Sequence, residues 1–420
     1  MIETEGRKND RLKISQFILS LIAFLITLLG AASCFAGGSL LLSDPELYAE
    51  ESRVLFAFGS ICIVLSVVHF LALVNALKKP SPIGSALQPK SRSFLFASIT
   101  LLGWAFFLAL NYFHIAEASL LPTRPFMTPF VIGIPIWWFI EFGKRNLPRI
   151  TTRKQTAALS ISSSYGMMFI LLFEMIVIAL VIAGVLLYLS TQPQIRQWMD
   201  SFSLPQNLSQ LDIHLIERYA RTLLRTPIFL VIVFLLVGLV LPLIEEILKP
   251  IAIWTLHRRS ISPAEGFILG LYFGAAFALV ESGGMIIQLG MGSWVTSTLL
   301  RAATGLLHIT CSGLVGYAYA RFMQLERKIS AAIPLLIAVA LHGTWNTVAV
   351  LSSLGSLSAE IGMSGFFSPI WDHVFSALMV LLWLTAFSIL WKMNKKLQKD
   401  LSLLSHNENN DPGVHTFELE

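Results

Sequence analysis

Long apolar segments recur along almost the whole chain, and their length limits the folds that it can adopt. A membrane-spanning helix needs about 20 consecutive, mostly apolar residues, and a hydropathy window of about 19 residues finds ten such stretches. They are residues 14–36, 54–77, 94–113, 126–142, 165–189, 227–254, 264–289, 299–321, 330–353 and 373–391. Only helices and closed barrels satisfy their backbone hydrogen bonds inside a bilayer. The sequence therefore predicts an all-α, polytopic transmembrane helix bundle with about ten spanning helices.

The composition agrees with an integral, multi-pass protein of the cell membrane. Hydrophobic residues make up 55% of the chain and charged residues 13%, whereas charged residues are about a quarter of a soluble domain. The mean hydropathy is +0.71. The net charge of +5 is spread over short loops, which indicates orientation in a lipid bilayer and not binding of nucleic acid. The three cysteines lie inside apolar segments without metal-ligand spacing and are interpreted as core residues.

The distribution of basic residues predicts how the helices are oriented. Lys and Arg are concentrated at the N-terminus, in every second loop and near the C-terminus. Because basic loops remain cytoplasmic, both termini are predicted to be cytoplasmic. Residues 190–226 are an exception, since they should lie outside yet carry four arginines. Apolar residues at helical spacing over 208–225 predict an amphipathic helix on the outer surface, which would explain these arginines.

The sequence divides into five parts. Residues 1–190 form a five-helix membrane region of unknown role, in which the first helix is expected to be an uncleaved anchor. Residues 191–226 are an extracytoplasmic loop, and 227–355 carry the candidate chemistry. The last transmembrane helix falls within 356–398, and the polar segment 399–420 is predicted to be disordered.

Ionisable side chains inside the apolar segments of the second half most strongly indicate a function. A charge placed in hydrocarbon costs from about 2.5 to more than 10 kcal/mol, so such residues normally face a bundle interior or a wet cavity. Four successive predicted helices carry them. The residues are Glu245, Glu246, Lys249, Glu281, Arg301, His308, His342 and Asn346.

The adjacent carboxylates Glu245 and Glu246 are suited to acid–base chemistry. In a dry site two neighbouring carboxylates compete for protons, and this gives a membrane site a general acid or base. Lys249 follows Glu245 at the favourable spacing for a helical ion pair. Pro242 and Pro250 remove two backbone donors and can open this turn. Alternatively, the segment is a solvated helix end at the membrane surface.

The other polar residues lie on the next three predicted helices. Glu281 follows a stripe of small residues, which predicts close packing against another helix; the stripe is Gly266, Gly270, Gly274 and Ala278. Arg301 and His308 are seven residues apart on one helix face, and His342 and Asn346 are four apart on the next helix. A single buried histidine is often only a structural residue. Two histidines beside three glutamates favour an active or ion-binding site.

In order and spacing these pieces resemble the PrsW family of intramembrane proteases. The resemblance covers about 227–355 and includes Glu245-Glu246-x-x-Lys249, the segment 274–281 that ends in Glu281, the Arg301-to-His308 helix and His342-x-x-x-Asn346. The family is related to the CAAX-processing membrane proteases. The resemblance implies hydrolysis of peptide bonds of membrane-anchored protein substrates in or near the bilayer. Ser282 stands where the family has Asn, which affects a neighbouring contact more than the chemistry.

The mechanism that the resemblance suggests is glutamate-based. Glu245 or Glu246 takes a proton from the attacking water, and His308 with His342 stabilises the oxyanion. Lys249 or Asn346 orients these groups, and no cofactor is required. In a zinc-dependent alternative Glu246, His308 and His342 are ligands, although a His-Glu-x-x-His helix is absent.

Two other classes of protein are consistent with the same residues. A proton- or ion-coupled transporter also uses membrane Glu and His residues as a relay. The two halves of the chain show no internal repeat, which argues against that class. In a non-catalytic scaffold the same residues would only join helices.

Overall fold

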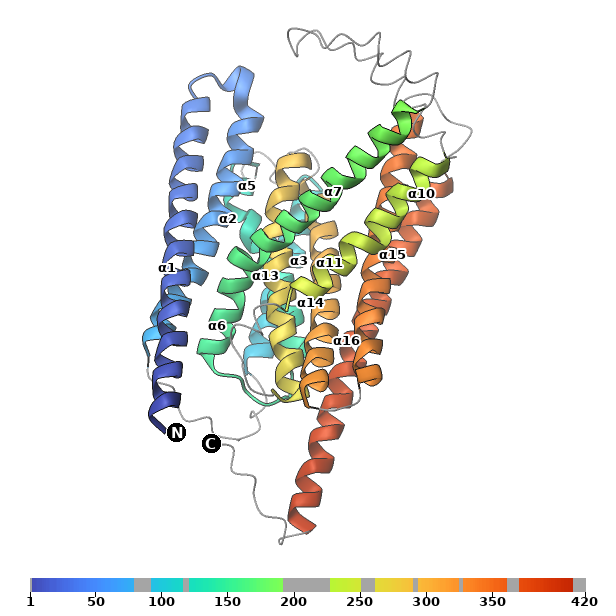
Figure 1. Cartoon of the computed structure of the whole chain (residues 1–420). Coiled ribbons are helices and arrows are strands. Elements are labelled where there is room, and N and C mark those ends of the chain that lie inside the picture. Colours follow the sequence, from blue (N-terminus) through green and yellow to red (C-terminus); the bar gives the residue numbers. More distant parts are fainter. Residues whose placement is uncertain are drawn as a thin grey trace. The chain divides into compact units, whose positions relative to one another are not determined.

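The computed structural model describes residues 2–78, 92–115, 121–191, 227–250, 261–289, 294–324, 328–360 and 370–410 (Figure 1). Over these ranges the regular structure is helical and contains no strand. Ten of the helices described are long and apolar enough to cross a membrane. The prediction of an all-α membrane bundle is therefore confirmed, and the chain is an integral, multi-pass membrane protein.

Each predicted span corresponds to one continuous helix or to a helix with a π-helical turn inside it. The first four spans are α1 (Ile2–Leu41), α2 (Pro45–Leu77), α3 (Arg92–Tyr112) and, after the short η1 (Leu121–Thr123), α5 (Arg124–Gly143). The fifth consists of α6 (Thr152–Ile161), η2 (Ser162–Gly166) and α7 (Met167–Ser190), and the sixth of α10 (Pro227–Leu235), η4 (Leu236–Val240) and α11 (Leu241–Leu248). The last four are α13 (Pro263–Leu289), α14 (Trp294–Gln324), α15 (Lys328–Glu360) and α16 (Ile370–Asn410).

Two sequence predictions concern segments at the edge of the described residues. Helix α16 continues to Asn410, into the segment that the sequence predicts to be disordered, while 411–420 lie outside the described residues. The amphipathic helix predicted over 208–225 also lies outside them. That helix stays a prediction.

The chain divides into two compact units. Unit 1 comprises Met1–Met167, Lys249–Ala338 and Thr385–Glu420, and unit 2 comprises Met168–Leu248 and Val339–Leu384. The backbone passes from unit 2 to unit 1 between Leu248 and Lys249, at the end of α11. Each unit contains part of the polar residues that the sequence singles out.

In unit 1, α13 and α14 pack backbone to backbone along the small-residue stripe, and they lie side by side in Figure 1. A Cβ atom added to Gly270 would lie 2.1 Å from the carbonyl oxygen of Ser312, and one added to Gly274 would lie 2.3 Å from that of His308. Because the stripe has no side chains, the helices approach closely enough for dense packing. The predicted stripe is confirmed, and it fixes the backbone of His308 against α13.

The N-terminal helices of unit 1 support these two helices. The side chain of Ile61 on α2 lies against Gly283 of α13, 3.4 Å from the position that a Cβ would take. The side chain of Ile136 on α5 lies against Gly305 of α14, 3.0 Å from the corresponding position. At the end of α5 the ammonium of Lys144 donates to the hydroxyl of Tyr272, 3.0 Å away on α13. Burial alone would lower the pKa of Lys144, but Tyr272 and Glu141 outweigh it, so that the pKa is raised. The N-terminal region thus packs directly on the helices that carry candidate site residues.

In unit 2 the sixth span crosses α15 at two glycines. A Cβ added to Gly343 of α15 would lie 1.8 Å from the carbonyl oxygen of Gly238 in η4, and one added to Gly238 would lie 2.5 Å from Oγ1 of Thr347. Pro242 has no N–H to donate to the carbonyl of Gly238, four residues earlier. The π-helical turn and Pro242 together leave this carbonyl facing the neighbouring helix. The crossing determines where the end of α11 lies along α15.

The stripe leads to a prediction about stability. Gly270→Ala places a methyl group against the backbone of α14, which cannot move as a side chain can, and overpacking of this kind costs about 1–3 kcal/mol. We expect a lower thermal unfolding midpoint in detergent than for wild type. Gly284→Ala on the same helix is the matched control, since a Cβ there meets nothing within 4 Å. Equal midpoints for the two variants would contradict this description of the α13–α14 contact.

Candidate functional site

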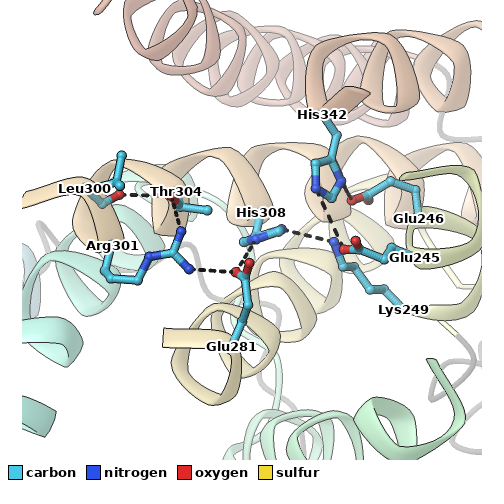
Figure 2. A network of polar contacts seen from close by, with 9 residues as sticks. All are labelled: Glu245, Glu246, Lys249, Glu281, Leu300, Arg301, Thr304, His308 and His342. Carbon is cyan, nitrogen blue, oxygen red and sulfur yellow. Dashed lines mark hydrogen bonds and ion pairs between the residues drawn. The ribbon is translucent and has the colours of Figure 1, made fainter. Parts of the chain in front are cut away.

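Two glutamates and a histidine form a buried cluster in unit 2, here called the Glu-Glu-His cluster (Figure 2). Glu245 and Glu246 lie near the end of α11, and His342 lies on α15. Nδ1 of His342 is 2.9 Å from Oε1 of Glu246, and Nε2 is 3.8 Å from Oε2 of Glu245. The imidazole ring therefore lies between the two carboxylates.

The two glutamates face different nitrogens of the His342 ring. An ionised carboxylate can only accept hydrogen bonds, so with Glu246 ionised the 2.9 Å contact is a hydrogen bond that Nδ1 of His342 donates. The lone pair of Nε2 is then directed toward Glu245. The separation of 3.8 Å between Nε2 and Glu245 is too long for a direct hydrogen bond, and polar groups at such distances are often bridged by water.

The Gly238–Gly343 crossing explains why these side chains meet. Gly343 directly follows His342, and its close approach to Gly238 holds α15 against the sixth span about two helical turns before Glu245 and Glu246. Since the two carboxylates are adjacent in the sequence, they point about 100° apart around α11. One can therefore reach Nδ1 of His342 while the other faces Nε2.

A second group of polar side chains lies in unit 1 and is called the Lys-His cluster; it consists of Lys249, Glu281, Arg301 and His308. Nζ of Lys249 is 3.1 Å from Nδ1 of His308, and Nε2 of the same ring is 2.8 Å from Oε2 of Glu281. Arg301 is 3.3 Å from that carboxylate oxygen and donates to Oγ1 of Thr304 at 2.8 Å. Figure 2 shows this chain of contacts.

The Lys-His cluster carries more positive than negative formal charge. Lys249 and Arg301 are both buried, and Glu281 is the half-buried acid of the group. Nζ of Lys249 also lies 4.1 Å from the ring centroid of Phe277, at cation–π distance. Such a group is suited to stabilising negative charge.

The comparison with protein-family models bears directly on both clusters. Residues 209–386 match the model of the PrsW family, described as PrsW family intramembrane metalloproteases. Residues 209–386 are a PrsW-family protease region. The match starts before and ends after the 227–355 segment of the sequence resemblance and includes both clusters. No curated protein and no solved structure matches the chain.

The PrsW-family match over residues 209–386 supports a peptide-bond hydrolase of the membrane. The chain is thus an enzyme, and the family resemblance inferred from four short motifs is confirmed. The PrsW-family region includes α10 to α15, whereas α1 to α7 precede it. Those earlier helices support the region through the contacts of α2 and α5 with α13 and α14.

The family description raises the question of a metal ion in the PrsW-family region. In unit 2 the Glu-Glu-His cluster offers one ligand atom from each residue, and these atoms lie within 4.8 Å of one another. Carboxylate oxygen and imidazole nitrogen are both zinc ligands, so this group could hold a metal ion. Oε2 of Glu246 and Nε2 of His342 take no part in the hydrogen bond between the two residues, so zinc could bind through these atoms without breaking it. Both ring nitrogens of His308 are in contact with Lys249 and Glu281.

The structure distributes the eight residues named from the sequence over the two units. Seven of them belong to the two clusters. The eighth, Asn346, is half-buried on α15 one helical turn after His342, and no side-chain hydrogen bond of Asn346 is found among the described residues. Ser282 is fully buried beside Glu281.

Sequence reasoning missed the two glycines of the crossing, Gly238 and Gly343. A signal for the first exists in the Gly238-x-x-x-Pro242 spacing, because a proline frees the carbonyl four residues before it. Gly343 lies inside the His342-x-x-x-Asn346 motif, but the motif itself gives no signal for a helix crossing at this glycine.

Proposed function

We propose that this protein is an intramembrane endopeptidase that hydrolyses membrane-associated protein substrates in or near the bilayer with a glutamate-activated water. The observation that carries the proposal is the position of the His342 ring, in contact with Glu246 on one side and facing Glu245 on the other. A buried base, an orienting partner and an imidazole are the parts that general acid–base catalysis of hydrolysis requires.

In this proposal Glu245 is the general base. A water molecule donates one hydrogen bond to Oε2 of Glu245 and the other to Nε2 of His342, while Glu246 holds the ring through Nδ1. Glu245 takes the proton as the water oxygen attacks the scissile carbonyl carbon. Glu245 then gives the proton to the leaving amine as the C–N bond breaks. His342 thus orients the water, a different task from the oxyanion stabilisation that the sequence suggested.

The Lys-His cluster supplies positive charge in the same reaction. Lys249 follows Glu245 and Glu246 by four and three residues, and the backbone is continuous through Leu248. We propose that Lys249 and His308 stabilise the oxyanion of the tetrahedral intermediate. Preorganised donors of this kind typically contribute about 10²–10³ in kcat. Asn346, on the helix of His342, is proposed to support the carbonyl group.

The protein's own residues suffice for this chemistry, and we propose that no metal is required. Zinc bound at Glu245, Glu246 and His342 would act as a Lewis acid and lower the pKa of a bound water. The hydrogen bond between Glu246 and His342 holds the imidazole ring in place without a metal ion.

Metal removal tests this part of the proposal. We expect purified protein to contain well under one zinc per chain by elemental analysis, and to keep its activity after treatment with 1,10-phenanthroline. Inactivation by the chelator, reversed by added zinc and accompanied by about one zinc per chain, would establish the metal-dependent form. The His342→Ala variant would then lose that zinc.

Co-expression with candidate substrates tests the function itself. Wild type and the Glu245→Gln variant are expressed at equal levels with a panel of single-span membrane proteins, and shortened products are followed on gels. We expect a shortened product with wild type and not with Glu245→Gln. A panel that remains intact with wild type, or is cut equally by both, would argue against the proposal.

A further inference from the structure

His308 uses both of its ring nitrogens inside the Lys-His cluster. Nδ1 is 3.1 Å from the ammonium of Lys249, and Nε2 is 2.8 Å from a carboxylate oxygen of Glu281. The ring is fully buried, and its edge packs on Phe277 with a centroid distance of 4.8 Å. A histidine that accepts or delivers a proton in catalysis needs a nitrogen directed toward the reacting atoms.

The partners of the ring indicate its protonation. An ammonium has donors and no acceptor, so Lys249 donates to Nδ1, and the ring proton lies on Nε2 and is donated to Glu281. Arg301, 3.3 Å from the same carboxylate oxygen, favours the ionised form of Glu281 as the acceptor.

The opposite arrangement, a neutral lysine beside a charged imidazole, is less favourable. The ordinary pKa of a lysine is about 10.4 and that of a histidine about 6.5, so a proton shared by the pair belongs on the lysine. The Phe277 ring, 4.1 Å from Nζ, also stabilises a cation at that position. The charge of this pair is therefore carried by Lys249.

From these contacts we infer that Lys249 is the catalytic residue that stabilises the oxyanion and that His308 is a positioning residue for its ammonium. The inference rests on the proposed function and assigns separate roles within it. Arg301 donates a 2.8 Å hydrogen bond to Thr304 and forms an ion pair with Glu281. Glu281 contacts Nε2 of His308, and Nδ1 of His308 contacts Lys249. The chain of contacts fixes a flexible lysine side chain before substrate arrives, so that little order has to be gained in the transition state.

The backbone supports this positioning. The carbonyl oxygen of His308 lies against Gly274 of α13, and Thr304 donates to the carbonyl of Leu300 one turn earlier on α14. The two helices that carry Glu281, Arg301 and His308 are thus closely packed. Lys249 directly follows the last residue of α11 and does not lie on either helix.

Kinetics of four variants test the inference with a substrate that wild type cleaves. Lys249→Met keeps the length of the side chain and removes its charge, and we expect kcat to fall about 10²–10³-fold with KM nearly unchanged. The kcat of His308→Ala should fall by the same factor. The kcat of His308→Asn should remain within about tenfold of the wild-type value, since the side-chain oxygen of asparagine can replace Nδ1 as the acceptor for Lys249. Lys249→Arg should be intermediate.

Two outcomes would overturn the inference. The first is a Lys249→Met enzyme with the kcat of wild type. The second is a His308→Asn enzyme that is folded, as judged by its thermal midpoint, yet as inactive as His308→Ala, because only a proton-transferring or metal-binding histidine requires an imidazole. Failure of the proposed function is distinguishable from both, since in that case wild type would cleave no substrate or Glu245→Gln would cleave as fast as wild type.

Discussion

Replacement of Glu245 by glutamine is expected to lower kcat by about 10³-fold while KM changes little. The substitution keeps the size of the side chain but removes the carboxylate that takes the proton from water, and loss of a general base costs about 10²–10⁴ in rate. The measurement is the initial rate of substrate cleavage by purified protein in detergent or lipid vesicles. Thermal unfolding of the same samples shows whether the variant is folded.

Glu246→Gln separates the roles of the two neighbouring acids. Its amide oxygen can still accept the hydrogen bond from Nδ1 of His342, so we expect a loss of about tenfold, much smaller than for Glu245→Gln. Glu50→Gln is the surface control, because Glu50 belongs to an exposed ion pair with Arg53, and exposed pairs contribute about 0–1 kcal/mol. A larger loss of cleavage rate for Glu246→Gln than for Glu245→Gln would indicate that Glu246 is the general base and Glu245 the orienting partner.

Gly343→Ala is expected to reduce activity about 10²-fold although it adds only a methyl group. The new Cβ would lie 1.8 Å from the carbonyl oxygen of Gly238, so α15 and the sixth span must separate by roughly 1 Å or more. The separation would pull His342 away from Glu246, and misplacement by about 1 Å can cost about 10²-fold in rate. The cleavage rate, compared with that of His342→Ala, checks the prediction.

Two further variants make this test specific. Gly184→Ala, on α7 of the same unit, is the control because a Cβ there meets nothing within 4 Å. Gly238→Ala should be impaired by contact with Oγ1 of Thr347, and the double variant with Thr347→Ala should recover, since the next atom is 3.6 Å away. Wild-type activity of Gly343→Ala would contradict the proposed importance of the crossing.

The spanning helices were predictable because a bilayer imposes their length and composition. Even α5, interrupted by Pro129 and Pro135, was recognised from its apolar character and is one continuous helix. The stripe from Gly266 to Gly274 also predicted a close helix contact. The π-helical turns η2 and η4 were not predicted, since one extra residue in a helical turn does not change the mean hydropathy of the segment.

The ionisable residues that gather in the two clusters were predictable from the sequence, but their pairings were not. Ionisable groups in apolar segments identified Glu245, Glu246, His308 and His342, because such groups are costly in a membrane. Spacing along the chain does not reveal that His342 contacts Glu246 or that His308 contacts Lys249. These pairings depend on backbone crossings, such as that of Gly238 with Gly343, which bring together residues far apart in the sequence.

Cleavage in water enriched in ¹⁸O tests most directly the claim that Glu245 activates water for peptide hydrolysis. Wild type and Glu245→Gln are purified, reconstituted with a single-span substrate in lipid vesicles, and the products are analysed by mass spectrometry. We expect wild type to give a fragment cut in or near the bilayer with one ¹⁸O atom in its new C-terminal carboxylate, and Glu245→Gln to give about 10³-fold less of it. Equal amounts of labelled fragment from both proteins, or none from wild type, would contradict this claim.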